Sequence, residues 1–412
     1  MRFLSSLKLA LILFAVAGLF GCTTAEERLE RKAATIHNNI LTLDSHLDTP
    51  LMIGREGFDI GQRNDPHQGG GKLDFPRMKE GGLDAAIFAV YLGQGPLTQE
   101  GYERANQRAL GIFETIHNTM NKHQDVAGLA LTPDDAYRLS EQGKRAIYIG
   151  NENGYPIGYD LSLLQKYYDL GSRYLGLSHS RHNQICDAST DSEPPLHNGL
   201  SEFGVEVVKE LNRLGMMVDV THISDKAFYD VLKVSKAPVI ASHSNARAIC
   251  DHPRNLDDDM IIELAENGGV LQLCVLSAYV KQMPPDPERD AALNAVREKW
   301  NHFNDLTDEE MEQARAEWNE VNRKYPRPLA TVADLVDHID HVVNLVGVDY
   351  VGIGTDFDGG GALKDCFDVS ELGNITLELV RRGYSKKDIE KIWSGNFMRV
   401  FRQVEQIAQQ MQ

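Results

Sequence analysis

Acidic and histidine side chains follow one another along this sequence at the ends of short apolar runs, where they could bind metal ions. They are His46, Asp48, Glu152, His179, His222, His243 and Asp356. His46 and Asp48 stand two residues apart on an extended segment, so their side chains point to the same side and could clamp one divalent ion. His222 and His243 end two later runs and could supply a second pair of ligands. Imidazole and carboxylate together favour zinc or a similar ion.

Two metal ions held close together would share a hydroxide, which is a strong nucleophile at neutral pH, and they would polarise a scissile carbonyl group. Glu152 is placed to bridge two ions, because its run lies between the two pairs of ligands. We therefore expect hydrolysis through a metal-bridging hydroxide. A serine nucleophile is not expected, because the sequence lacks a Gly-x-Ser-x-Gly motif.

These residues need a scaffold that brings the ends of distant segments together. Apolar runs without internal proline alternate with helical stretches, a pattern typical of parallel strands covered by helices. The runs span residues 40–46, 85–91, 146–150, 174–179, 216–222, 239–243, 270–275 and 350–356. They predict an α/β fold, a closed (β/α)8 TIM barrel, whose strand ends converge on one active-site face. An open doubly wound sheet is the alternative, but it usually carries a Gly-rich phosphate turn, which is missing here.

Two amphipathic stretches, residues 203–214 and 335–346, are predicted to be helices that cover the barrel. His338 and His341, which lie on the second, are expected on its solvated face because acids surround them. Residues 281–327 are polar and charged, and we interpret them as a helical insertion after the seventh strand, with a helix over residues 308–324. A solvated excursion without a catalytic role is the simpler interpretation of this insertion.

The N-terminus resembles a bacterial lipoprotein signal. Arg2 and Lys8 flank the start of an apolar run that is too short to span a bilayer, and Gly21 and Cys22 follow it. We expect residues 1–21 to be a signal peptide and Cys22 to be lipidated, whereas a plain secretory signal or an uncleaved anchor are the alternatives. The protein would then be secreted across the inner membrane and lipid-anchored to a bacterial cell membrane, facing the periplasm. Residues 22–34 would be a linker, 35–405 the hydrolase barrel and 406–412 a tail.

The composition sets limits on partners. The chain has 412 residues, of which 42% are hydrophobic and 25% charged, so it can bury a large core and is neither disordered nor fibrous. Its net charge of −18 disfavours nucleic acid as a partner, and it disfavours binding to anionic lipid through a general field. The cysteines after Cys22 are widely spaced, so the sequence does not pair them, and Cys274 is expected to be a small core residue.

Several motifs resemble those of the membrane (renal-type) dipeptidases of the amidohydrolase superfamily. They are His46-Leu-Asp48, Gly150-Asn-Glu152, Leu177-Ser-His179, Val220-Thr-His222, Ser242-His243, Arg254-Asn255 and Gly354-Thr-Asp356-Phe-Asp358-Gly359. The resemblance implies a zinc-dependent barrel with two Zn²⁺ ions per chain. In that family pattern His46 and Asp48 would bind one ion, His222 and His243 would bind the other, and Glu152 would bridge both.

The resemblance also implies the substrate-binding and catalytic residues. His179 and Arg254 would hold the substrate, His179 would stabilise the oxyanion, and Asp356 would exchange protons with the bridging water. From the sequence alone, a surface ion pair of Arg254 with Asp251 or Asp257 is as well supported as a role in substrate binding. The implied substrates are dipeptides, with D-residues at the second position as one option. The loop that begins at His179 and the insertion differ from those of some members, so no side-chain preference is carried over.

Two other functions stay open at this point. The first is another amidohydrolase activity on lactones, cyclic amides or N-acyl amino acids, with the same metal-binding residues. The second is a peptide-binding lipoprotein without catalysis, which the complete set of metal-binding residue types argues against. The sequence leaves open whether the chain forms a homodimer.

Overall fold

The computed structural model describes residues 24–303 and 306–411, so the predicted signal peptide and Cys22 lie outside the described residues. A parallel sheet forms the centre, with neighbours in the order β1-β2-β4-β5-β6-β7-β8-β9. The strands are β1 (Leu43–Leu47), β2 (Ala85–Tyr91), β3 (Ala127–Leu129), β4 (Arg145–Glu152), β5 (Ser172–Gly176), β6 (Met217–Asp219), β7 (Ile240–Ser244), β8 (Val270–Leu273) and β9 (Val351–Ile353). Each of the eight predicted runs overlaps one of these strands.

Backbone hydrogen bonds close the sheet between β1 and the segment after β9. The amide of Asp48 donates to the carbonyl of Phe357 at 2.9 Å, and the amide of Asp356 donates to the carbonyl of His46 at 3.0 Å. Leu47 and Phe357 also form a parallel bridge. The predicted (β/α)8 barrel is therefore confirmed, and its closure places Asp356 directly beside His46 and Asp48.

Strand β3 was not predicted from the sequence; it has only three residues and pairs with the first part of β4. Such a short segment shows no periodicity from which a strand could be predicted. It lies off the closed path of the barrel strands.

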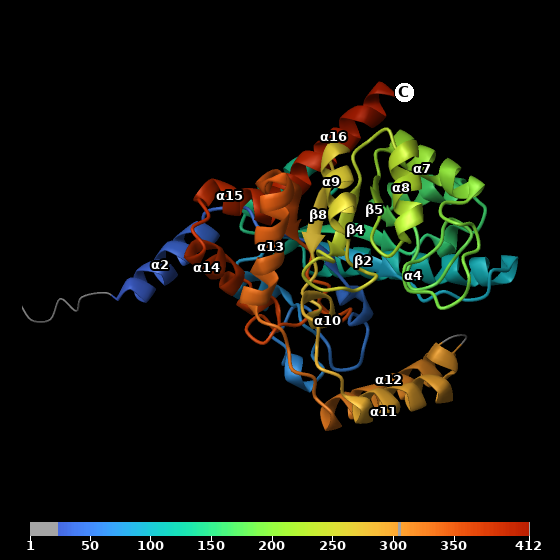
Figure 1. The fold of residues 1–412 in the computed structure, drawn as a ribbon, viewed down its shortest axis with the longest axis horizontal. Coiled ribbons are helices and arrows are strands. Elements are labelled where there is room, and N and C mark those ends of the chain that lie inside the picture. Colours follow the sequence, from blue (N-terminus) through green and yellow to red (C-terminus); the bar gives the residue numbers. More distant parts are fainter. Residues whose placement is uncertain (1–23, 304–305, 412) are drawn as a thin grey trace, which may run out of the picture.

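Helices surround the strands (Figure 1). They are α2 (Ala25–His37), α3 (Phe75–Glu80), α4 (Gln99–Lys122), α5 (Pro133–Glu141), α6 (Ser162–Asp169), α7 (Glu202–Leu214), α8 (Asp225–Val234), α9 (Asp258–Glu266), α13 (Val332–Val346), α14 (Gly373–Arg381), α15 (Lys386–Glu390) and α16 (Asn396–Gln410). In α7, the hydroxyl of Ser201 accepts from the amide of Gly204, and Gly215 ends the helix with a φ of 78°. Within the described part of the chain, every helix is too short or too polar to cross a bilayer.

The expectation for His338 on α13 was wrong. Its ring is fully buried, because Nδ1 accepts from the amide of Ala246 while Nε2 faces the carbonyl of Val280 at 2.8 Å. The ring thus satisfies two backbone groups next to β7 and α10 (Ser277–Val280). His341 lies on the more exposed side of α13, where it pairs with Asp258.

The predicted insertion forms a pair of helices, α11 (Pro287–Lys299) and α12 (Asp308–Lys324). The side chains of Lys299 and Trp300 contact Glu317 and connect the two helices. Figure 1 shows the pair apart from the outer helices, on the side of the barrel toward which β8 points. The insertion therefore lies toward the face on which the strand ends converge.

Candidate active site

The barrel brings the seven predicted side chains into one cluster at the carboxyl ends of its strands. His46, Glu152 and His243 lie on β1, β4 and β7, and the others follow β1, β5, β6 and β9. Three overlapping groups offer ligand atoms that lie within 4.8 Å of one another. The groups are His46, Glu152 and His243; Glu152, His179 and His222; and His46, Asp48 and Asp356.

Glu152 lies at the centre, and its two oxygens face different imidazoles. Its Oε2 is 3.4 Å from Nε2 of His46, while its Oε1 is 3.0 Å from Nε2 of His222 and 3.5 Å from Nε2 of His243. Nε2 of His222 and Nε2 of His243 are themselves only 3.0 Å apart. A carboxylate in this arrangement can contribute one oxygen to each of two neighbouring cations.

Three buried atoms of the cluster lack a hydrogen-bond partner among the described residues: Nε2 of His46, Oδ1 of Asp48 and Nδ1 of His222. Oδ2 of Asp48 lies 3.5 Å from Nε2 of His46, so both side chains are directed at one point. Unsatisfied buried polar atoms destabilise a fold unless a ligand satisfies them. The donor set, imidazole nitrogen and carboxylate oxygen, fits zinc.

The protonation states of the cluster also suit metal binding. Burial by itself would raise the pKa of Glu152, but the surrounding imidazoles of His46, His222 and His243 outweigh it and hold the pKa well below its ordinary value. Burial lowers the pKa of His222 and of His243 well below that of free histidine. Ionised Glu152 therefore faces the neutral imidazoles of His222 and His243, which are the forms that bind a cation. Burial would also lower the pKa of His46, but Tyr174 and Glu152 outweigh burial and raise this pKa well above that of free histidine.

The pKa of Asp356 is shifted in the opposite direction from that of Glu152. Burial, and after it the charge of Asp48, raise the pKa of Asp356 well above its ordinary value. Cys274, a fully buried thiol as predicted, lies with its Sγ 3.8 Å from Oδ2 of Asp356. Cys186, Cys250, Cys274 and Cys366 are all buried and free. Asp356 is thus a buried carboxyl group that binds protons readily, beside the candidate metal ligands.

Hydrogen bonds behind the cluster fix two imidazole rings. The hydroxyl of Tyr174 donates to the carbonyl of Ser45 at 3.3 Å and lies 2.8 Å from Nδ1 of His46, so it can accept from Nδ1–H. The hydroxyl of Ser242 donates to Asp219 at 2.6 Å and lies 2.9 Å from Nδ1 of His243. In both rings this pattern leaves the Nε2 lone pair free to bind a cation. Tyr174 and Asp219 were not predicted as site residues, because Tyr174 lies inside β5 and Asp219 lies inside the predicted run 216–222, before its terminal His222.

His179 and Arg254 lie beside the cluster. Nε2 of His179 is 3.8 Å from Oε1 of Glu152, and its ring contacts that of Tyr91 with centroids 4.9 Å apart. Arg254 is 3% exposed and donates to the carbonyl of His243 at 3.1 Å and to the hydroxyl of Ser244 at 3.3 Å. It therefore does not form the surface ion pair with Asp251 or Asp257 that the sequence had left open.

No acid within the described ranges pairs with Arg254, whose Nε is buried without a hydrogen-bond partner. Its guanidinium also lies over the ring of Tyr279, 5.3 Å from the centroid. A buried cation that is held only by neutral groups is suited to bind an anionic group of a ligand.

Gly359 lets the two carboxylates approach each other. A Cβ atom at this position would lie 2.1 Å from Oδ1 of Asp356 and 2.1 Å from Oδ2 of Asp48. Gly359→Ala is therefore expected to displace both carboxylates and to weaken zinc affinity at least about 10-fold, the usual effect of disturbing the surroundings of a metal ligand. Zinc affinity of the purified variant checks this. Gly111→Ala in α4, where a Cβ meets nothing within 4 Å, is the control, and equal affinities in both variants would contradict the prediction.

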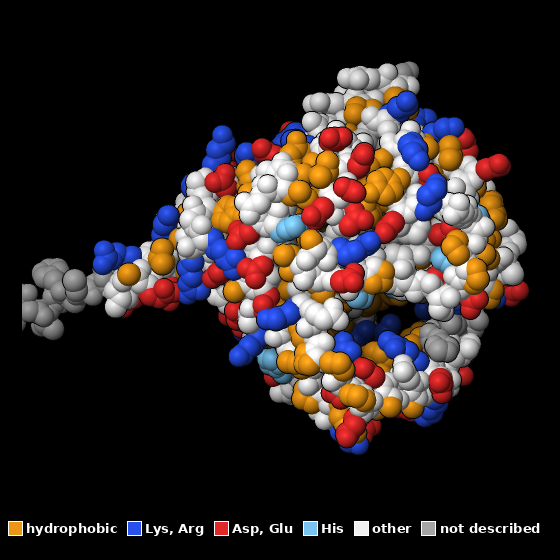
Figure 2. Space-filling view, viewed as in Figure 1, with side chains coloured by type: hydrophobic (Ala, Val, Ile, Leu, Met, Phe, Trp, Pro, Cys, Tyr) orange, Lys and Arg blue, Asp and Glu red, His pale blue; other side chains and the backbone are white. Residues whose placement is uncertain are grey.

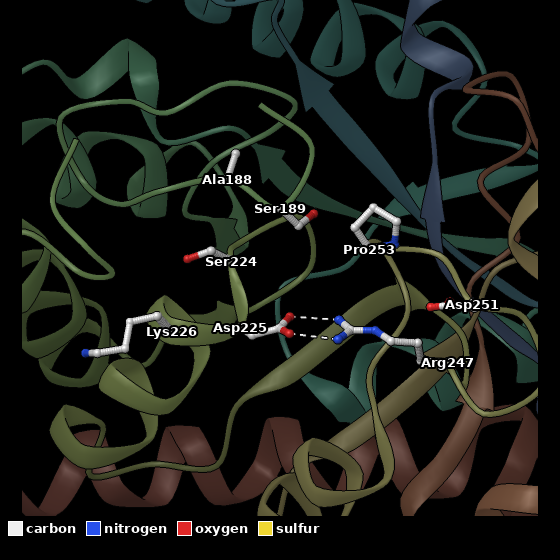
Figure 3. Close-up of a pocket in the computed structure, with 8 residues that line it drawn as sticks. All are labelled: Ala188, Ser189, Ser224, Asp225, Lys226, Arg247, Asp251 and Pro253. Carbon is white, nitrogen blue, oxygen red and sulfur yellow. Dashed lines mark hydrogen bonds and ion pairs between the residues drawn. The ribbon is translucent and has the colours of Figure 1, made fainter. Parts of the chain in front are cut away.

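A separate cavity of about 450 Å³ adjoins the site (Figure 3). Arg247 spans it with two hydrogen bonds of 2.7 Å to Asp225. Ser189 on its wall donates its amide to the carbonyl of His222, and Pro253 directly precedes Arg254. The cavity thus shares chain segments with the site, but none of the seven candidate metal-binding residues lines it.

Comparisons with known proteins agree with this arrangement. Residues 30–412 match the family described as membrane dipeptidase (Peptidase family M19). Dipeptidase tcpJ of Claviceps purpurea is 32% identical over 372 residues, which cover 89% of this chain and 77% of that protein. Dipeptidase 3 of Mus musculus is 29% identical, covering 93% of this chain and 69% of that protein.

Two solved structures are similar over nearly the whole fold. The probable dipeptidase PvdM from Pseudomonas aeruginosa has a TM-score of 0.80 and 30% sequence identity, covering 92% of this chain and 99% of that chain. A metallopeptidase described as dipeptidase AC has a TM-score of 0.71 and 25% identity, covering 89% of this chain and 98% of that chain.

Proposed function

Because the chain belongs to the membrane dipeptidase family, Peptidase family M19, we propose that it is a dinuclear zinc enzyme that cleaves L-L and L-D dipeptides. One observation carries the proposal of two ions. Glu152 presents Oε2 to the side of His46 and Oε1 to the side of His222 and His243. In this assignment His46 and Asp48 would hold one ion, His222 and His243 would hold the other, and Glu152 would contribute to both.

Zinc bound at these residues would lower the pKa of a water molecule toward neutrality and polarise the peptide carbonyl. Asp356 is suited to accept the proton of the attacking water and to pass it to the leaving amine, because its pKa is raised. The side chains thus supply the proton transfers that hydrolysis of a peptide bond requires.

His179 and Arg254 would orient the dipeptide. Nδ1 of His179 lies 2.9 Å from the hydroxyl of Ser180, while its Nε2 faces the cluster and can donate to the carbonyl oxygen as negative charge develops there. Arg254 can bind the free C-terminal carboxylate through its planar guanidinium. A fixed cation that binds this carboxylate would restrict the substrate to two residues.

A substrate panel tests this function. The zinc-loaded protein is assayed with L-L dipeptides, L-D dipeptides, N-acyl amino acids and a lactone at equal concentrations. We expect hydrolysis of both dipeptide classes, with at least about 100-fold lower kcat/KM on the lactone, which lacks the free carboxylate, since a desolvated charge pair is lost. Preferred cleavage of lactones or N-acyl amino acids would instead favour the broader amidohydrolase activity.

We also propose that a lipid on Cys22 anchors the enzyme to a bacterial membrane, facing the periplasm. This proposal is supported by the basic start, the short apolar run and the Gly21-Cys22 pair of the sequence. Cys22→Ser is expected to release a water-soluble protein with unchanged specific activity, because the anchor precedes the barrel. Partitioning into a detergent phase measures the release, and a variant that still enters this phase would show that the attachment has another cause.

A further inference from the structure

The helical insertion lies on one side of the approach to the cluster of candidate metal ligands. Figure 2 shows a hollow between the barrel and the region of α11 and α12, with Lys or Arg side chains gathered around it. Trp318 of α12 packs toward α11, since it contacts Phe303 and Arg297. Arg315, which precedes it by three residues, is partly exposed and lies near groups of the barrel.

Two arginines, one on the barrel and one on α12, lie near enough for the charge of one to act on the other. Arg55 belongs to the loop that follows η1 (Thr49–Leu51), close in the chain to Asp48. Removal from bulk water, and after it the like charge of Arg315, lower the pKa of Arg55. Burial raises the pKa of Tyr91, and the charge of Arg315 opposes this rise. Because the ring of Tyr91 contacts that of His179, Arg315 lies near the substrate-binding side of the cluster.

Neither arginine has an acidic partner in the part of the chain that the structure describes: no ion pair or hydrogen bond joins Arg55 or Arg315 to a carboxylate there. Two acids act on Arg55 from a distance, Glu312 and Asp358. Asp358 is already engaged, since its oxygens accept from the hydroxyl of Thr49 at 2.8 Å and from the amide of Lys72 at 2.7 Å. Glu312 is exposed on α12. Two adjacent cations without a counter-ion repel each other, so an anion between them would be stabilised.

We propose that Arg315, together with Arg55, makes the enzyme select dipeptides that carry a negatively charged side chain. This inference rests on the proposed dipeptidase function and names its substrate class. Arg254 would bind the C-terminal carboxylate, so Arg55 and Arg315 remain for a second carboxylate. The insertion then determines specificity rather than being a solvated excursion.

The test compares substrates that differ by one charge. The zinc-loaded enzyme is assayed with Ala-Glu against Ala-Gln and with Glu-Ala against Gln-Ala, and the pair with the larger ratio identifies the residue whose side chain is recognised. We expect wild-type kcat/KM to be about 10-fold higher for the acidic member of one pair, with the ratio falling as salt is added. Arg315→Ala should reduce the ratio below about 3-fold, and Arg315→Glu should invert it, while the neutral substrates react as before.

Two further variants separate the possible outcomes. Arg55→Ala should lower the same ratio from the barrel side, and Arg323→Ala, an exposed arginine later on α12, should leave it unchanged. The inference would be overturned, while the proposed function stands, by either of two results. One is a wild-type ratio of acidic to neutral substrate near one, and the other is a ratio that Arg315→Ala leaves intact while neutral dipeptides are cleaved. If no dipeptide is cleaved by the wild type, the proposed function fails and the inference fails with it.

Discussion

Replacing Asp356 with Asn is expected to lower kcat at least about 100-fold while the chain remains folded and keeps its zinc, because a general acid–base group typically contributes this much. The carboxyl group is buried, its pKa is raised, and it lies beside the carboxylate of Asp48. An amide has nearly the same shape but cannot accept and return the proton. Steady-state kinetics, with zinc content measured on the same samples, give the result.

Asp358→Asn is the matched control for this prediction. Asp358 stands two residues further on, but its oxygens bind Thr49 and the amide of Lys72 instead of facing the cluster. We expect its effect on kcat to stay below about 10-fold. Near-normal turnover of a zinc-replete Asp356→Asn variant would remove Asp356 from the mechanism.

For Arg254→Ala, we expect a loss of about 2–4 kcal/mol in transition-state stabilisation on a free dipeptide, as for the loss of a desolvated charge pair. The wild type should cleave the corresponding dipeptide amide far more slowly than the free acid, and the variant should lose most of this difference. The reason is that Arg254 is buried, is held by the carbonyl of His243 and the hydroxyl of Ser244, and lacks an acidic partner among the described residues. The kcat/KM values of the acid and amide in both proteins provide the comparison.

Arg247→Ala controls for the removal of any arginine from this loop. Its guanidinium is paired with Asp225, so the variant should retain the preference for the free acid. If Arg254→Ala cleaves the free acid normally, or the wild type cleaves amides equally well, the group that measures substrate length lies elsewhere. The function would then be closer to that of a broader amidohydrolase.

The barrel and its cluster could be predicted because parallel strands leave a simple pattern in the sequence. Each strand is a short apolar run, and a polar residue such as His46 or Glu152 at its end must lie on the common face. From the sequence alone, a surface ion pair and a ligand-binding role were equally well supported for Arg254. Only the family resemblance favoured the ligand-binding role. The structure excludes the surface ion pair, because the side chain of Arg254 is only 3% exposed.

Contacts between distant segments left no such pattern. Tyr174 reads as one more apolar strand residue, yet its hydroxyl lies against Nδ1 of His46. His338 lies among acids in the sequence, but α13 turns it inward onto two backbone groups. Arg315 lies on a charged helix, and only the position of that helix opposite the barrel brings it near Arg55.

Titration of the metal-free protein with zinc, followed by hydrolysis of one dipeptide, tests the central claim most directly. Because Oε2 of Glu152 faces His46 and Oε1 faces His222, we predict that activity rises with added zinc and reaches its maximum at two equivalents per chain. Activity that is complete at one equivalent, or that does not depend on added metal, would contradict a dinuclear zinc dipeptidase.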